Sequence, residues 1–152
     1  MAVTIEIENK QKKIPLNPNQ IHKLVRKILR LERVLDVRLS LAFVTDREIR
    51  SLNKRFLGRS YTTDVLAFDL TTQNLSRSSR KKISTIDGEI VISTTSAYRN
   101  AKEFGMLPYR EVALYIVHGT LHLLGYDDHS PKNRRSMRIK EKDLMEQLFH
   151  DS

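Results

Sequence analysis

The sequence predicts one domain of mixed α and β structure, and three observations lead to that expectation. Apolar residues alternate with a period of two in two segments, and two further short runs are apolar enough to lie inside a sheet. In five other segments the apolar residues recur at helical spacing. The chain has 152 residues, 39% of them hydrophobic and 30% charged, which suits a single core over residues 1–152.

The first half of the chain is expected to form a strand, a helix, a strand and a second helix. Strands are predicted over residues 3–7 and 37–43, where every second residue is apolar. Between them, Asn17 is placed to cap a helix and Pro18 to occupy its first position. The inward face of that helix is an apolar stripe of Ile21, Leu24, Val25, Ile28 and Leu29. Thr45 and Glu48 have the spacing of a capping box that opens the second helix.

The second half is expected to supply two more strands and three more helices. Strands are predicted over residues 64–70 and 88–92, and the polar segment 71–84 between them is typical of a long loop. A helix over residues 95–104 should stop at Gly105. Residues 112–117 and 121–124 are apolar on nearly every face, as in a helix enclosed by its domain. Pro131 precedes a final helix.

Composition limits the partners and the chemistry. Lys and Arg number 27 against 18 Asp and Glu, so the formal net charge is +9 and a polyanion such as nucleic acid is the natural partner. The chain has no cysteine, which excludes disulfides, thiolate metal sites and a cysteine nucleophile. No signal peptide and no apolar run long enough for a membrane span is seen, so we expect a soluble cytoplasmic protein.

Three of the five histidines lie close together, in the segment HGTLHLLGYDDH. His118 and His122 are four residues apart in the enclosed helix, so both imidazoles lie on one face and can chelate one ion. Gly125 is suited to end that helix and turn the chain, which allows His129 to return as a third ligand. Three nitrogen ligands and an open fourth position are typical of a catalytic zinc site.

The alternative is that these are ordinary histidines, since such a pair also arises by chance. A shared ion is favoured because an unpaired polar group in an enclosed helix costs about 1 to 3 kcal/mol. Zinc peptidases of the HExxH type carry a glutamate base directly after the first histidine, where this chain has Gly119. Phosphodiester cleavage, which relies on charge stabilisation by metal and cations, fits the basic composition better.

The segment HGTLHLLGYDDH closely resembles the signature of the YbeY family, the bacterial single-strand endoribonucleases of ribosomal RNA maturation. Upstream stretches resemble the same family and occur in its order, namely Leu52 and Asn53 followed by residues 63–68, and the strand segment Gly88, Glu89 and Ile90. The resemblance covers roughly residues 4–148, and the histidine segment is its most specific part.

The resemblance implies an α+β, zinc-hydrolase-like fold in which one four-stranded mixed sheet is flanked by helices. It implies one Zn²⁺ per chain, held by His118, His122 and His129, and a metal-dependent endoribonuclease activity on single-stranded RNA. It also implies roles in 16S rRNA 3′-end processing and ribosome quality control. The implied partners are single-stranded RNA, rRNA, and the ribosome or ribosomal proteins.

Two departures from the family pattern concern the site. The family has five residues between its second and third histidines, whereas this chain has six between His122 and His129. Asp128 therefore falls at the place of the third ligand in a simple alignment. We expect the loop to absorb one residue and His129 to bind, with Asp128 as the alternative. Leu57 stands where many family members carry an arginine proposed to hold RNA.

The expected catalytic groups are His118, Arg59 and Glu89. The metal is expected to activate water or to stabilise the scissile phosphate. Arg59, or else Arg55, is expected near that phosphate because a guanidinium matches its geometry, although either can be a solvated residue. Glu89 is expected to accept a proton, and its alternative role is that of a cross-strand partner.

Three basic runs can track an RNA backbone, although such runs are more often solvated faces. They are Lys23, Arg26, Lys27 and Arg30; Arg77, Arg80, Lys81 and Lys82; and Lys132, Arg134, Arg135 and Arg138. Two other functions compete with the nuclease. One is a ribosome-assembly factor that binds RNA and uses the metal only to hold its fold. The other is a zinc hydrolase of a small substrate, whose binding should depend little on salt.

Overall fold

The four expected strands form one mixed sheet. The structure is a computed structural model that describes residues 2–57, 64–71 and 85–150. The strands are β1 (Val3–Asn9), β2 (Asp36–Val44), β3 (Val65–Asp69) and β4 (Thr85–Ser93), in the spatial order β1-β2-β4-β3. β1, β2 and β4 are parallel, and β3 runs antiparallel to β4 along one edge. The expected fold class, a four-stranded mixed sheet flanked by helices, is confirmed.

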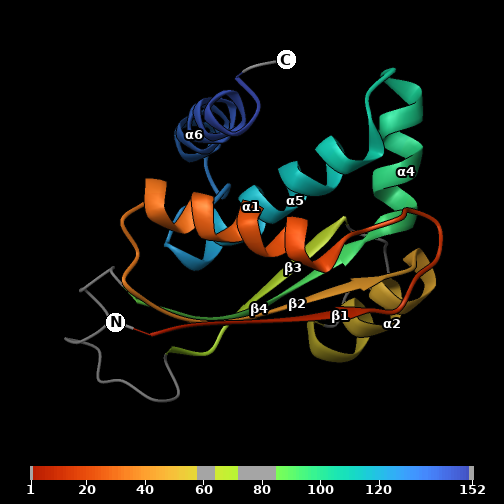
Figure 1. The fold of residues 1–152 in the computed structure, drawn as a ribbon, viewed down its shortest axis with the longest axis horizontal. Coiled ribbons are helices and arrows are strands. Elements are labelled where there is room, and N and C mark those ends of the chain that lie inside the picture. The colour runs from red at the N-terminus through yellow and green to blue at the C-terminus, as the bar shows by residue number, and fades with distance from the viewer. Residues whose placement is uncertain (1, 58–63, 72–84, 151–152) are drawn as a thin grey trace.

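Helices lie on both faces of this sheet (Figure 1). The five helices of the described residues are α1 (Pro18–Leu31), α2 (Asp46–Leu57), α4 (Thr94–Glu103), α5 (Pro108–Leu123) and α6 (Pro131–Leu148). α1 and α5 cover one face, and α6 packs on both of them, whereas α2 lies on the opposite face. None of these helices is both long and apolar enough to cross a membrane. Most of the expected loop 71–84 lies outside the described residues.

The local signals predicted from the sequence form as expected. The Asn17 side chain accepts hydrogen bonds from the backbone N–H groups of Asn19 and Gln20 at 2.9 and 3.3 Å, which caps α1. The Thr45 hydroxyl accepts one from the backbone N–H of Glu48 at 3.3 Å at the start of α2. Gly105 has a φ of +65°, a conformation that suits glycine at the end of α4.

The central strands separate two cores. Leu39, Leu41, Ile90 and other residues of the larger core face α1 and α5, whereas Val91 belongs to the smaller core on the α2 side. Successive side chains of a strand point to opposite faces, so the residues of β4 alternate between these two layers. This alternation decides which residues of β4 can reach a group on α5.

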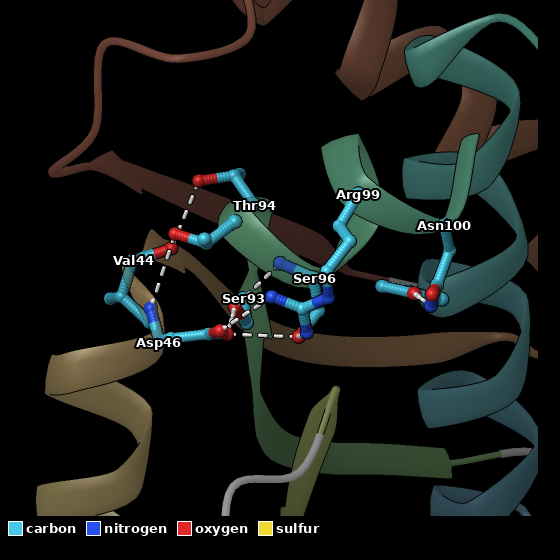
Figure 2. A network of polar contacts seen from close by, with 9 residues as sticks. Val44, Asp46, Ser93, Thr94, Ser96, Arg99 and Asn100 are labelled. Carbon is cyan, nitrogen blue, oxygen red and sulfur yellow. Dashed lines mark hydrogen bonds and ion pairs between the residues drawn. The ribbon is translucent and has the colours of Figure 1, made fainter. Parts of the chain in front are cut away.

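A polar network joins the start of α2 to α4 (Figure 2). The hydroxyls of Ser93 and Ser96 donate to Oδ1 of Asp46, the latter at 2.8 Å, and Arg99 donates to Oδ2 at 3.1 Å. Burial raises the pKa of Asp46, but the hydrogen bonds from Ser93, Ser96 and Arg99 outweigh it and lower the pKa below its ordinary value. The charged carboxylate therefore holds α2 and α4 together.

Candidate metal centre

α5 carries both histidines of the predicted pair in its last two turns. A methyl group built on Gly119 would lie 2.7 Å from Cγ2 of Ile90, so the helix backbone lies directly against β4 at this point. Position 119 faces the sheet and not solvent, and the base of an HExxH peptidase has no room there. His118 and His122 are half-buried beside this contact and line a cavity at the β3 edge.

The two imidazoles present the same nitrogen to one another. Nε2 of His118 lies 3.1 Å from Nε2 of His122, and their ring centroids are 4.6 Å apart. Nδ1 of His118 contacts Oε2 of Glu141 on α6. Burial lowers the pKa of His122, and the neighbouring His118 lowers it further. Both effects favour the neutral imidazole, which is the form that binds a metal.

The third group at the histidine pair is Asp128. Its carboxylate and the two imidazoles each offer one atom, and these atoms all lie within 4.8 Å of one another. His129 also lines the cavity, but its side chain is 85% exposed and does not belong to this group. The carboxylate that lies with the two imidazoles is therefore the alternative named from the sequence, and His129 as third ligand stays a prediction.

Asp128 and His129 lie in the turn that follows α5. Gly125 takes a φ of +104° and reverses the chain. The Asp127 carboxylate accepts a hydrogen bond from the backbone N–H of His129 at 3.0 Å and one from Asn133 Nδ2 at 2.8 Å. Asp127 therefore joins this turn to the first turn of α6. Asp128 lies with the two imidazoles, and the exposed His129 side chain lines the same cavity.

The cavity beside this group has a volume of about 390 Å³. Polar residues from three elements meet there, since Asn53 comes from α2, Asp69 from β3 and His118 from α5. Its apolar lining consists of Val65, Leu66, Ala67 and Leu123. A donor set of two imidazole nitrogens and one carboxylate oxygen is one that zinc binds in catalytic sites. The residues present therefore fit a zinc ion beside an open cavity.

Of the other expected catalytic groups, Glu89 is described by the structure and Arg59 is not. Glu89 lies between Gly88 and Ile90 on β4, and both of these neighbours face α5, so Glu89 faces the α2 layer. The structure therefore does not bring Glu89 to the histidines. α2 ends at Leu57, and Arg59 lies outside the described residues. Arg55 stacks near the Phe56 ring at 5.7 Å and does not line the cavity.

Two residues of the site escaped the sequence analysis as functional groups. Glu141 contacts His118 from α6, and its place four residues after Met137 and three before Leu144 puts a carboxylate on the buried stripe of that helix. Asn53 is only 1% exposed and lines the cavity. In both cases a polar residue stands at a buried position of a helix, and this pattern in the sequence could have marked it as a functional group.

A smaller cavity of about 190 Å³ lies on the other side of His118. Asp64, Tyr115 and Glu141 line it together with Val65, Leu114 and His118. Burial raises the pKa of Tyr115, and its hydroxyl accepts a hydrogen bond from Asn100 at 2.7 Å. Glu141 therefore contacts His118 from the side of this smaller cavity.

The comparisons with known proteins find relatives over nearly the whole chain. The family model for Endoribonuclease YbeY matches residues 6–149. An endoribonuclease YbeY of Syntrophus aciditrophicus is 37% identical over 146 residues, which cover 95% of this chain and 89% of the relative. An endoribonuclease YbeY of a Thermoanaerobacter species is 36% identical over 157 residues, which cover 96% of this chain and 98% of the relative. The solution structure of TM1509 from Thermotoga maritima superposes with a TM-score of 0.66 at 28% identity, covering 97% of this chain and 91% of that one.

Proposed function

Because the chain belongs to the endoribonuclease YbeY family, we propose that it is a zinc-dependent endoribonuclease that hydrolyses phosphodiester bonds in single-stranded RNA. The observation that carries this proposal is the convergence of His118, His122 and Asp128 at one cavity. The net charge of +9 supports a polyanionic substrate. Ribosomal RNA is the proposed substrate in the cell, in 16S 3′-end maturation and ribosome quality control, with the ribosome as partner.

The proposed zinc ligands are His118, His122 and Asp128. His129 is the alternative third ligand, which the experiment below compares with Asp128. When bound, zinc supplies positive charge and Lewis-acid chemistry at a phosphate. Asp128 brings a negative charge that a third histidine would not, so it neutralises part of the charge of the ion. The proposed site therefore depends on cations of the protein to hold the RNA phosphates.

Residues around the ligands are proposed to position the RNA. Arg134 donates to the backbone oxygen of Asp128 at 3.2 Å, so a guanidinium stands at the loop that carries this ligand. Asn53 lines the cavity with a buried side chain and is proposed to shape it. Arg59 stays the proposed cation at the scissile phosphate, as the sequence predicts. The apolar wall of Val65, Ala67 and Leu123 limits access of water.

Metal content and RNA cleavage, measured on the same samples, test this proposal. The purified protein should carry about one zinc per chain by elemental mass spectrometry and should cut single-stranded RNA. His118→Ala and Asp128→Ala should lose the metal and lower cleavage by roughly 100-fold or more, because ligand loss removes the Lewis acid. His129→Ala is the matched control and should keep both. A chelator should abolish cleavage, and added zinc should restore it.

Two results would contradict the proposal. A wild type that is folded, free of metal and able to bind RNA without cutting it would identify a ribosome-assembly factor. Loss of zinc in His129→Ala, with zinc kept in Asp128→Ala, would replace Asp128 by His129 as the third ligand and leave the nuclease standing.

A further inference from the structure

We infer that Glu141 is a positioning residue of the metal centre, which fixes the ring of His118 and thereby sets the affinity of the site for zinc. The inference rests on the proposed function, since it concerns the same ion. Its basis is the contact between Oε2 of Glu141 and Nδ1 of His118, which joins α6 to α5. Glu141 is no ligand, because the group of candidate ligand atoms consists of His118, His122 and Asp128.

The position of Glu141 in α6 is unusual for a carboxylate. Met137 and Leu144 are buried at 2% and 1% exposure, and Glu141 lies between them on the same helical stripe. The Glu141 side chain is only 16% exposed. A carboxylate in such a place is costly unless a charged or hydrogen-bonding partner meets it, and His118 is that partner.

The contact decides which nitrogen of His118 is free for an ion. A carboxylate oxygen against Nδ1 requires a hydrogen on Nδ1, so the lone pair of the neutral ring is on Nε2. Nε2 is the atom that lies 3.1 Å from Nε2 of His122. Glu141 therefore selects the tautomer and the ring orientation that direct His118 toward the shared ion. Carboxylate partners of metal-binding histidines raise metal affinity in this way.

α6 is fixed firmly enough to give this contact a defined geometry. Nζ of Lys140 lies 2.9 Å from Oε2 of Glu32 at the end of α1, and the Glu32 side chain is only 8% exposed. Lys140 lies midway along α6, and in the first turn of the helix Asn133 bonds to Asp127 and Arg134 to the backbone of Asp128. One helix thus fixes the loop of the third ligand and the ring of the first.

Zinc affinity, measured by competition with a chelating dye at constant pH, tests the inference. Glu141→Leu removes the acceptor but keeps the volume of the apolar stripe, and it should weaken zinc binding by about 10- to 100-fold. Glu141→Gln keeps an oxygen that accepts from Nδ1 and should lose clearly less. Glu146→Leu changes an exposed glutamate of the same helix and should bind zinc within about twofold of the wild type. The melting temperature of each metal-free variant shows whether the fold alone has changed.

The outcomes separate the inference from the function on which it rests. Weaker zinc binding in Glu141→Leu, with little change in Glu141→Gln and Glu146→Leu, supports the positioning role. Wild-type affinity in folded Glu141→Leu, or an equal loss in Glu146→Leu, overturns it while the zinc site stands. A fall in the metal-free melting temperature with unchanged affinity also overturns it, because Glu141 then only holds α6. A wild type that binds no zinc overturns the inference and the proposed function together.

Discussion

Gly119 of α5 and Ile90 of β4 meet so closely that a methyl group at position 119 would lie 2.7 Å from Cγ2 of the isoleucine. A second close approach lies nearby, because a methyl group on Gly88 would be 2.7 Å from the backbone oxygen of Phe68 and 2.8 Å from Cδ2 of Leu123. These two glycines set the distance between α5 and the sheet. The depth of the histidines in the cavity follows from that distance.

Gly119→Ala should therefore destabilise the protein by about 1 to 3 kcal/mol, since the added carbon must displace Ile90 or the helix. Urea unfolding measures this change. Ile90→Ala is the second variant of a double-mutant cycle, because it removes the atoms that the new methyl group would meet. The double variant should lose less stability than the sum of the two single variants. Additive losses would show that the two residues do not constrain one another.

The Asp46 network predicts a defined loss of stability in acid. The pKa of Asp46 is lower in the folded state than its ordinary value of 3.8. The carboxylate therefore contributes its full stabilisation at a pH above 3.8, and this contribution is lost as the pH falls through the folded-state pKa. Asp46→Asn should cost about 1 to 3 kcal/mol at pH 7. The difference from wild type should shrink below pH 3.8. Asp143→Asn, in which an exposed carboxylate bonded to Gln147 is changed, should show no comparable effect.

Zinc should stabilise the wild type by mass action, with about 2.7 kcal/mol gained when free zinc is 100 times the dissociation constant. Because Asp128 is the proposed third ligand, Asp128→Ala should lose most of this gain, whereas Asp128→His should keep it. Thermal melting with and without zinc measures both variants. An unchanged zinc-dependent shift in Asp128→Ala would exclude the aspartate as a ligand.

The basic residues at the start of α6 should bind RNA more strongly than those of α1. Arg135 and Arg138 are exposed on the helix that follows the proposed third ligand. Replacing both by Gln should weaken single-stranded RNA binding and reduce the slope of log K against log salt by about 0.7 for each lost phosphate contact. Lys23→Gln with Arg26→Gln, two exposed positions on α1, is the control and should leave the slope unchanged. Equal effects of the two pairs would indicate a diffuse electrostatic attraction.

The parts of the fold that short-range patterns encode were predictable. Asn17 caps α1 as its type and place indicate, and the spacing of His118 and His122 placed them on one helical face. That Asp128 lies with the two histidines was not predictable in this way. Its position depends on the loop after α5, where Asp127 bonds to Asn133 in the following helix, and no local pattern carries that information.

The positions of Glu89 and Glu141 were also not predictable from the sequence, because they depend on tertiary packing. The alternation of β4 puts Glu89 on the α2 side, but the sequence alone does not tell which side α5 covers. Glu141 meets a histidine of another helix, and the helix packing that joins them is a tertiary result. Its apolar neighbours on the stripe were visible in the sequence, whereas its partner was not.

The parallel pairing of β2 with β4 also affects how the chain reaches this structure. Asp36 pairs with Thr85, so the whole of α2 and β3 lies between two strands that must find one another. Non-local pairings of this kind slow folding, because the loop must close before the contacts stabilise it. The histidine pair rests on β4 through Gly119, so the centre forms only after this slow pairing, and partly folded chains hold no assembled site.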